Sequence, residues 1–321
     1  MSTWLPASKI NELAADPARQ MQDVEIGEID FSKPFVPEEY TQLYYTPVYD
    51  KLSARHRLRY NQLFGVRINE YIMMLEADLI ERMLQPLSRH RRIAGDDELL
   101  VAINTMIEEE KHHYQVFLKL NRACLPEVYD NGQERYFSDL PLQTRLTFGI
   151  VGMIARHLAF PLWYLMAMEE SSTALARDIA RCSDHPLGAL EPTFAKVHRE
   201  HMKDEARHLQ VDAHLIEACL LNEKGVRQAL NAKLFKVMLA GITKPKASGS
   251  GIKVISRLVQ ELPELEPLQH EMTQAVLALS DNTAFQESLF NRRIMPLTFG
   301  LFDASSQLAG LEEHMVGYER Q

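Results

Sequence analysis

The sequence predicts an all-α protein: a four-helix bundle core with additional flanking and C-terminal helices. From about residue 54 onward apolar residues recur with the helical period, and no strand-like alternation of any length appears. The pattern Glu-x-x-His occurs within residues 109–113 and again as Glu205-x-x-His208. Residues three or four apart share one helix face, so each copy directs a carboxylate and an imidazole the same way. Two such helices, with one glutamate from each of two more, form the inner shell of di-iron or di-manganese bundles.

The expected helices, in chain order, cover residues 54–85, 96–123, 139–181, 187–222, 224–242, 253–261, 267–280 and 283–301. Helix-breaking residues separate them, namely Pro86, Gly95, Asn131-Gly132, Asp184-His185-Pro186 and Gly249-Ser250-Gly251. Pro161 falls inside a long apolar stretch and is expected to kink that helix. We expect one domain over residues 1–321, with an irregular proline-bearing arm (1–38), a metal-binding bundle (54–222) and accessory helices (223–321).

Composition and charge restrict the class of protein. The hydrophobic fraction of 46% suits a sizeable core, and the net charge of -9 with dispersed basic residues argues against nucleic-acid binding. Without an apolar run of membrane-spanning length or a signal peptide, we expect a cytoplasmic protein with no membrane partner. The scattered cysteines are expected to be reduced thiols rather than disulfides or a zinc site. A homodimer is expected because closed two-fold assemblies are the commonest.

Charge patterning on residues 96–123 selects a frame for the first Glu-x-x-His copy. The polar residues cluster on one side of this helix, and Glu110 and His113 lie opposite them among apolar residues. The alternative pair, Glu109 and His112, points more sideways. The pattern therefore favours Glu110 and His113 as inward-facing, although the other frame stays open.

On residues 187–222 the side opposite the exposed charges carries ligand-type residues in what should be an apolar stripe. That stripe contains His198, His201, Glu205, His208 and Asp212. Buried charged groups must be paired or coordinate a metal ion, so this stripe predicts a metal site. The opposite side, which we expect to face water, includes Arg207.

The same test selects single glutamates on the other two helices. Glu76 lies opposite the charged residues of 54–85, whereas Glu70 is near the edge and is expected to face water. On 139–181 both Glu169 and Glu170 are candidates: Glu169 lies on the apolar stripe, and Glu170 shares a side with arginines.

Other polar residues are candidates for roles around these ligands. Glu109 and Asp204 each precede an expected ligand glutamate, from where each can hydrogen-bond the far nitrogen of the opposite histidine. Asp212, one turn beyond His208, belongs with them around the ligands. Arg292 and Arg293 offer a guanidinium fork to a substrate carboxylate, the alternative being an ordinary surface charge pair.

Carboxylate and imidazole ligands together suit iron that binds and activates oxygen, whereas thiolates would indicate zinc or iron–sulfur sites. We assign catalysis to the metal ligands alone. The chain has no Gly-x-Gly-x-x-Gly and no cysteine cluster, so it carries no flavin, nicotinamide or iron–sulfur site. An external electron donor is therefore expected.

At this point the chain resembles a known family. The string His201-Met-Lys-Asp-Glu-Ala-Arg-His208, with Glu76, Glu110, His113 and a glutamate near 170, is similar to the ferritin-like di-iron N-oxygenases typified by p-aminobenzoate N-oxygenase. The resemblance covers roughly residues 55–220. It implies a ferritin-like fold with a four-glutamate, three-histidine ligand set, completed by Glu169 or Glu170, in which His201 supplies the third histidine.

The resemblance also implies an activity. It indicates two iron ions cycling between Fe2+ and Fe3+, O2 as co-substrate, and oxidation of a primary amine to a hydroxylamine or on to nitroso or nitro in a natural-product biosynthetic pathway. The substrate would be a small-molecule amine or amino acid, free or carrier-tethered, with electrons from a reductase or ferredoxin-like partner. The alternatives are another di-iron oxidase, such as a C–H hydroxylase or desaturase, and a non-enzymatic ferritin-like iron-binding protein.

Overall fold

The computed structural model describes residues 4–130, 132–139, 157–182, 186–242 and 244–321. Within these ranges the chain forms helices and connecting loops and contains no β-strand, which confirms the all-α expectation. No helix in the described part of the chain is both long and apolar enough to cross a membrane.

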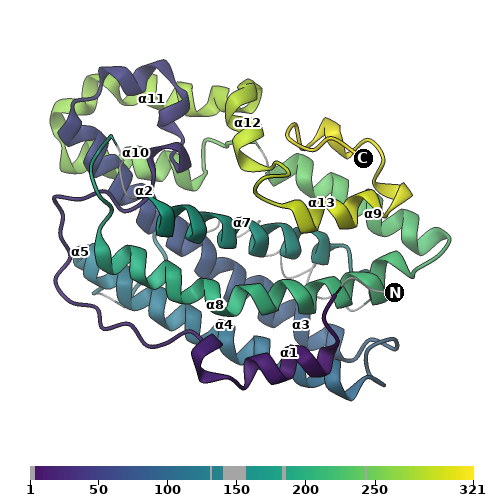
Figure 1. Ribbon diagram of the computed structural model, residues 1–321. Coiled ribbons are helices and arrows are strands. Elements are labelled where there is room, and N and C mark those ends of the chain that lie inside the picture. The colour runs from purple at the N-terminus through teal and green to yellow at the C-terminus, as the bar shows by residue number, and fades with distance from the viewer. Residues whose placement is uncertain (1–3, 131, 140–156, 183–185, 243) are drawn as a thin grey trace.

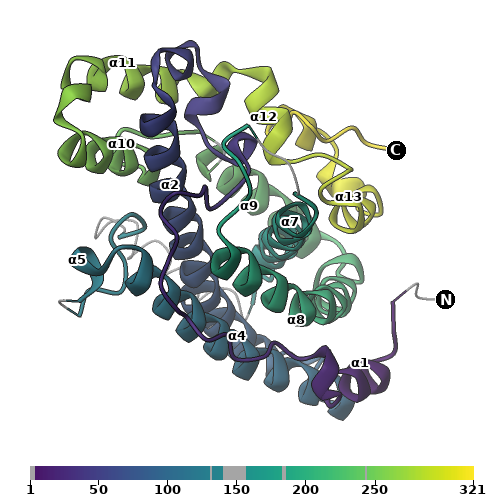
Figure 2. The same cartoon turned by 60° about the vertical axis from the view of Figure 1, so that its left-hand side comes forward.

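Four long helices lie side by side and form the bundle: α2 (Ala54–Met74), α4 (Asp97–Cys124), α7 (Pro161–Arg181) and α8 (Pro192–Ile216) (Figures 1 and 2). Their starts follow from local chemistry. Ser53, Asp96 and Glu191 each accept a hydrogen bond from a backbone N–H in the first turn of α2, α4 and α8. The fourth, α7, begins with a proline at its first position, where the missing N–H costs nothing.

Helix α2 does not continue as a regular helix to residue 85. It passes into a π-helical segment, Leu75–Ile80, and then into α3 (Glu81–Ser88), which extends past Pro86. The π-helical turn changes the direction in which successive side chains point, and such turns are frequent at functional sites. Glu76 lies in this segment, so its direction is set by the π geometry rather than by a continuous α-helix.

Two expectations about the N-terminal half were wrong. The arm over residues 1–38 is not irregular throughout, because α1 (Ala7–Ala14) packs on α4 and α8 with Ile10 and Ala14 buried. Pro161 begins α7 instead of kinking a helix, and residues 140–156, where the preceding part of that expected helix lies, are outside the described residues. The short 3-10 helices of the arm and the following segment are Pro17–Arg19, Glu38–Tyr40, Leu43–Tyr45 and Pro47–Lys51.

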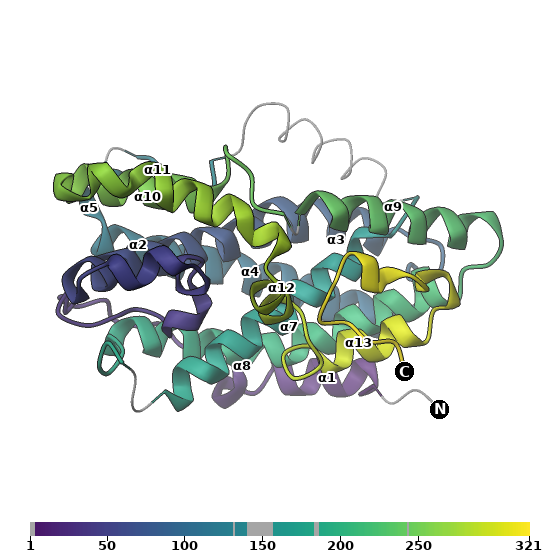
Figure 3. The same ribbon diagram turned by 90° about the horizontal axis from the view of Figure 1, so that it is seen from above.

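The C-terminal third supplies the flanking helices (Figure 3). Helices α10 (Ser250–Glu261) and α11 (Glu266–Leu277) lie at the end of the bundle where α2 begins, whereas α9 (Val226–Ile242) and α13 (Pro296–Asp303) pack on α7 toward the other end. The single helix expected over 283–301 is two helices, α12 (Thr283–Leu289) and α13, because Pro296 starts a new one. Short elements complete the chain: α5 (Pro126–Tyr129), Glu217–Leu221 (π), and 3-10 turns at Pro263–Leu265, Ala278–Asp281, Ser306–Leu308 and Leu311–Glu313.

Two apolar clusters fill the interior on either side of one polar layer. On α4, Met106 and Ile107 belong to one cluster, and Val116 and Phe117 to the other. The intervening turn carries buried polar residues, which is the place where a site in the bundle core is expected.

Candidate metal centre

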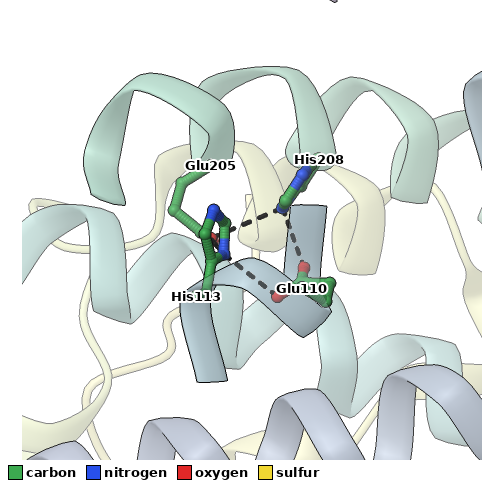
Figure 4. A group of neighbouring side chains, drawn as sticks. All are labelled: Glu110, His113, Glu205 and His208. Atoms are coloured by element: carbon green, nitrogen blue, oxygen red, sulfur yellow. Dashed lines mark hydrogen bonds and ion pairs between the residues drawn. The ribbon is translucent and has the colours of Figure 1, made fainter. Parts of the chain in front are cut away.

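Seven acidic and imidazole side chains from α4, α7, α8 and the π-helical segment after α2 converge in the polar layer, none more than 6% exposed. The contributing side chains are Glu76 from the π-helical segment, Glu110 and His113 from α4, Glu169 from α7, and His201, Glu205 and His208 from α8. Two overlapping groups have ligand atoms that all lie within 4.8 Å of one another: Glu110, His113, Glu205 and His208, shown in Figure 4, and Glu76, His113 and His201.

The distances show how the two groups share residues. His208 Nδ1 lies 2.9 Å from Glu110 Oε1 and 3.4 Å from Glu205 Oε1. His201 Nε2 lies 2.9 Å from the same Glu205 oxygen and 3.3 Å from Glu76 Oε1. Glu205 therefore stands between the two positions, as a bridging carboxylate would.

The atoms of this cluster are poorly satisfied by the protein itself. Several buried atoms lie in ion-pair contact with one another but have no partner in hydrogen-bond geometry among the described residues: Glu76 Oε1 and Oε2, Glu110 Oε1, Glu205 Oε2, His201 Nδ1 and Nε2, and His208 Nδ1. Leaving buried polar atoms unpaired is costly, and most such atoms in native proteins are paired. Divalent metal ions would satisfy them, and a mixed carboxylate–imidazole donor set suits iron or manganese. The residues present therefore fit a pair of metal ions.

Two of the histidines are held from behind by carboxylates. His113 Nε2 lies 2.9 Å from Asp204 Oδ2, and His208 Nε2 lies 2.9 Å from Glu109 Oε2. A proton on each Nε2 completes these hydrogen bonds, so Nδ1, which faces the cluster, becomes the lone-pair atom once a metal ion displaces its own proton. The structure thus places Glu109 and Asp204 behind the histidines.

The electrostatics of the cluster favour a cation. Burial lowers the pKa of His113, but its hydrogen bonds to Asp204 and Glu110 outweigh burial and raise the pKa to about 10. Burial raises the pKa of Glu76 to about 7, and burial together with the charges of nearby carboxylates raises the pKa of Glu169 well above its ordinary value. Despite burial, the pKa of Glu205 is instead held well below its ordinary value by His201, so without metal ions protons on the histidines and on Glu169 offset the crowded charges. Bound metal ions would displace those protons.

The structure distinguishes between the alternatives that the sequence left open. His112 is partly exposed and lies 3.0 Å from Asp23, so the inward pair on α4 is Glu110 and His113. Glu170 does not reach the cluster, and its assignment as a ligand is corrected. Its carboxylate accepts hydrogen bonds from the backbone N–H groups of Leu297 and Thr298 at the start of α13.

The remaining candidates lie around or away from the cluster. Asp212 is fully buried beyond His208, neither of its oxygens has a hydrogen-bond partner within the described chain, and burial raises its pKa well above the ordinary value. The arginines expected to bind substrate are not brought to the cluster. Arg292 pairs with Asp303 at 2.9 Å, and Arg293 has a side chain 72% exposed.

Sequence reasoning missed Arg207 and misjudged Glu70. Arg207 was expected to face water, yet it is buried and bonds both Glu109 and Asp204. Arg207 lies three residues after Asp204, and this spacing in a helix predicts an ion pair between them. Glu70 was also expected to face water, but it is fully buried and accepts hydrogen bonds from the Tyr129 hydroxyl and the Tyr136 and Ser138 N–H groups.

His198 shares the inward stripe of α8 without joining the cluster. Its Nε2 lies 3.0 Å from Asn69 Oδ1, and burial lowers its pKa to about 3. It is a neutral, hydrogen-bonded core histidine.

A pocket of about 210 Å³ opens beside the cluster on the side of α4 and the π-helical segment. Glu76 and Glu110 are among its lining residues, so a small molecule that enters it would lie beside two carboxylates of the cluster. Its other lining residues are Ala77, Ile107, Lys111, Tyr114 and Gln115.

Comparison with known proteins gives one family match. The family described as P-aminobenzoate N-oxygenase AurF matches residues 21–280, which include the whole bundle and every residue of the cluster. A search of curated proteins found no significant match.

Proposed function

The chain belongs to the p-aminobenzoate N-oxygenase family, and from that membership we propose that it is a di-iron monooxygenase that oxidises a primary amine with O2. The proposed product is a hydroxylamine, or its further nitroso or nitro oxidation products. The observation that carries the proposal is the convergence of carboxylates and histidines whose buried atoms have no hydrogen-bond partner among the described residues.

We assign the metal-binding roles within this proposal as follows. Glu110, His113, Glu205 and His208 would hold one ion, and Glu76 and His201, with Glu205 beside them, would hold the second. Glu169, whose Oε2 is 3.9 Å from His208 Nδ1, completes the set from α7. Two iron ions so bound would supply the coordination sites and electrons that activate O2.

The protein's own residues position the reactants and keep the layer dry. Apolar clusters on both sides of the cluster exclude water, which strengthens the electrostatic interactions within the layer. The pocket lined by Glu76 and Glu110 gives a small amine a route to the cluster. Because the chain has no flavin or iron–sulfur motif, a reductase or ferredoxin-like protein is the proposed electron donor.

The experiment is reconstitution with Fe2+ under anaerobic conditions, followed by addition of 18O2 and a panel of small primary amines. We expect about two irons per chain and 18O in a hydroxylamine, nitroso or nitro product identified by mass spectrometry. Iron binding with label appearing only in a C–H hydroxylated product, or in no product of any amine, would refute the proposed activity.

A matched pair of variants controls for folding and metal loading. His113→Ala removes a nitrogen that faces the cluster, so amine oxidation should be lost. His112→Ala, at the adjacent position of the same helix, removes a partly exposed ring whose polar partner within the described chain is the surface residue Asp23. Its activity should equal that of the unmodified protein.

A further inference from the structure

A buried arginine hydrogen-bonds the two carboxylates that in turn hydrogen-bond two histidines of the cluster. Arg207 is 6% exposed, and its Nη2 donates to Glu109 and, at 2.7 Å, to Asp204 Oδ1. Glu109 in turn holds Nε2 of His208, and Asp204 holds Nε2 of His113. One guanidinium nitrogen therefore connects two imidazoles that come from different helices.

The N-terminal arm reaches the same network through its backbone. We call residues 16–22 the strap; they follow α1 and hydrogen-bond side chains of α8. Arg207 Nη1 donates to the carbonyl oxygen of Arg19 at 2.6 Å. The backbone N–H of Met21 donates to Asp204, with distances of 3.1 and 3.2 Å to its two oxygens. The strap thus contacts both the arginine and one of its carboxylates.

We propose that Arg207 is a positioning residue for the metal centre, and that the strap is the part of the fold that keeps Arg207 and Asp204 in place. The carboxylates of the buried Asp204 and the partly buried Glu109 repel each other, and the shared guanidinium holds them at fixed positions. Each carboxylate then fixes the ring orientation of its histidine. Neither Arg207 nor the strap belongs to the set of proposed metal ligands, so both act through Glu109 and Asp204.

The geometry indicates how large the effect should be. Loss of a group that orients a metal-binding histidine typically weakens metal binding by about 10- to 100-fold. Because Arg207 supports two histidines, its loss should fall toward the upper part of that range. Lysine can replace the charge but not the planar fork, in which Nη2 donates to both carboxylates while Nη1 donates to the Arg19 carbonyl oxygen.

The test uses Co2+ as the metal, since its visible absorption reports the geometry of the ligands. Arg207→Met keeps a long apolar side chain without charge, and Arg207→Lys keeps the charge. We expect roughly 100-fold weaker Co2+ binding and an altered spectrum for Arg207→Met. The Arg207→Lys variant should recover part of the affinity. A variant that is merely less stable when metal-free, with unchanged Co2+ affinity and spectrum, would overturn the role of Arg207.

The strap is tested with a second matched pair. Met21→Pro removes the backbone N–H that Asp204 accepts, whereas Met21→Ala keeps that N–H and removes only the buried side chain. We expect Met21→Pro to alter the Co2+ spectrum in the same sense as Arg207→Met, and Met21→Ala to leave it unchanged. Equal spectra for both Met21 variants would overturn the role of the strap.

This inference rests on the metal-binding part of the proposed function and not on amine oxidation. If the unmodified chain binds no Co2+, the metal centre itself is refuted and the inference fails with it. If the unmodified chain binds Co2+ and the variants match it, only the inference fails. Should Arg207→Met not fold, Arg207→Lys and the Met21 pair decide the outcome.

Discussion

Replacing Glu109 and Glu110 separately with alanine gives a sharp test of the metal centre, because these adjacent residues lie in different layers around it. Glu110 Oε1 is 2.9 Å from His208 Nδ1, and Glu110 Oε2 is 3.2 Å from His113 Nδ1, so its carboxylate is inside the ligand group. Glu109 contacts only the outer nitrogen of His208 and Arg207 among the described residues.

The expected magnitudes differ accordingly. Glu110→Ala removes a ligand atom from a group of four, so the metal content should fall from two ions per chain toward one or none. Glu109→Ala leaves every ligand in place and removes an orienting hydrogen bond. It should weaken binding by about 10- to 100-fold, equivalent to about 1.4–2.8 kcal/mol.

The assay is anaerobic equilibrium dialysis against Co2+ or Fe2+, with metal and protein measured for each variant at several metal concentrations. At saturating metal, Glu109→Ala should still hold two ions per chain, whereas Glu110→Ala should not. The reverse order of metal loss would show that Glu109 faces the metal and that the assigned frame of α4 is wrong.

The remaining predictions concern pH, packing and a buried acid. The pKa of His113 is about 10, so a metal ion must displace a proton from this ring and Co2+ affinity should rise from pH 6 to pH 8. A Co2+ affinity that stays flat or falls over this range contradicts the prediction. The stability of the metal-free protein should change in the opposite direction with pH. The raised pKa of His113 contributes fully to the free energy of unfolding below about pH 6.5, and this contribution is lost as pH rises through about 10, which unfolding measurements check. Gly65→Ala places a Cβ 2.8 Å from Phe35 Cβ and should cost about 1–3 kcal/mol of stability; an unchanged Tm would show that the contact relaxes. Asp212→Asn replaces an acid whose pKa burial raises, so stability should change by less than about 1 kcal/mol and metal content should not change; loss of metal would make Asp212 a ligand.

The helix-face argument predicted the cluster because the ligand-type residues stand in apolar stripes. On α4 and α8 the exposed charges define one face clearly, and Glu110, His113, Glu205 and His208 lie opposite. His201 lies on the same inward stripe of α8, and the family resemblance gave it the role of the third histidine. The same argument was weaker on α7, which is apolar nearly all round, and only the structure shows that Glu170 turns to α13.

The misplaced residues share one physical cause: the face of a helix that seemed exposed is covered by a segment distant in sequence. Arg207 lies under the strap, whose Arg19 carbonyl accepts its hydrogen bond. Glu70 is covered by the segment around Tyr136 and Ser138. Charge patterning along one helix cannot predict such coverage, because it depends on tertiary contacts.

The buried carboxylate of Glu170 connects the bundle helix α7 to α13 near the C-terminus. The family match ends at residue 280, yet the amides that bind Glu170 belong to Leu297 and Thr298, beyond that limit. Shortening the chain to its matched region would remove both N–H donors of this buried carboxylate, which is adjacent in sequence to Glu169. The segment past residue 280 therefore satisfies a buried acid of the bundle, and any trimmed version should retain the chain through α13.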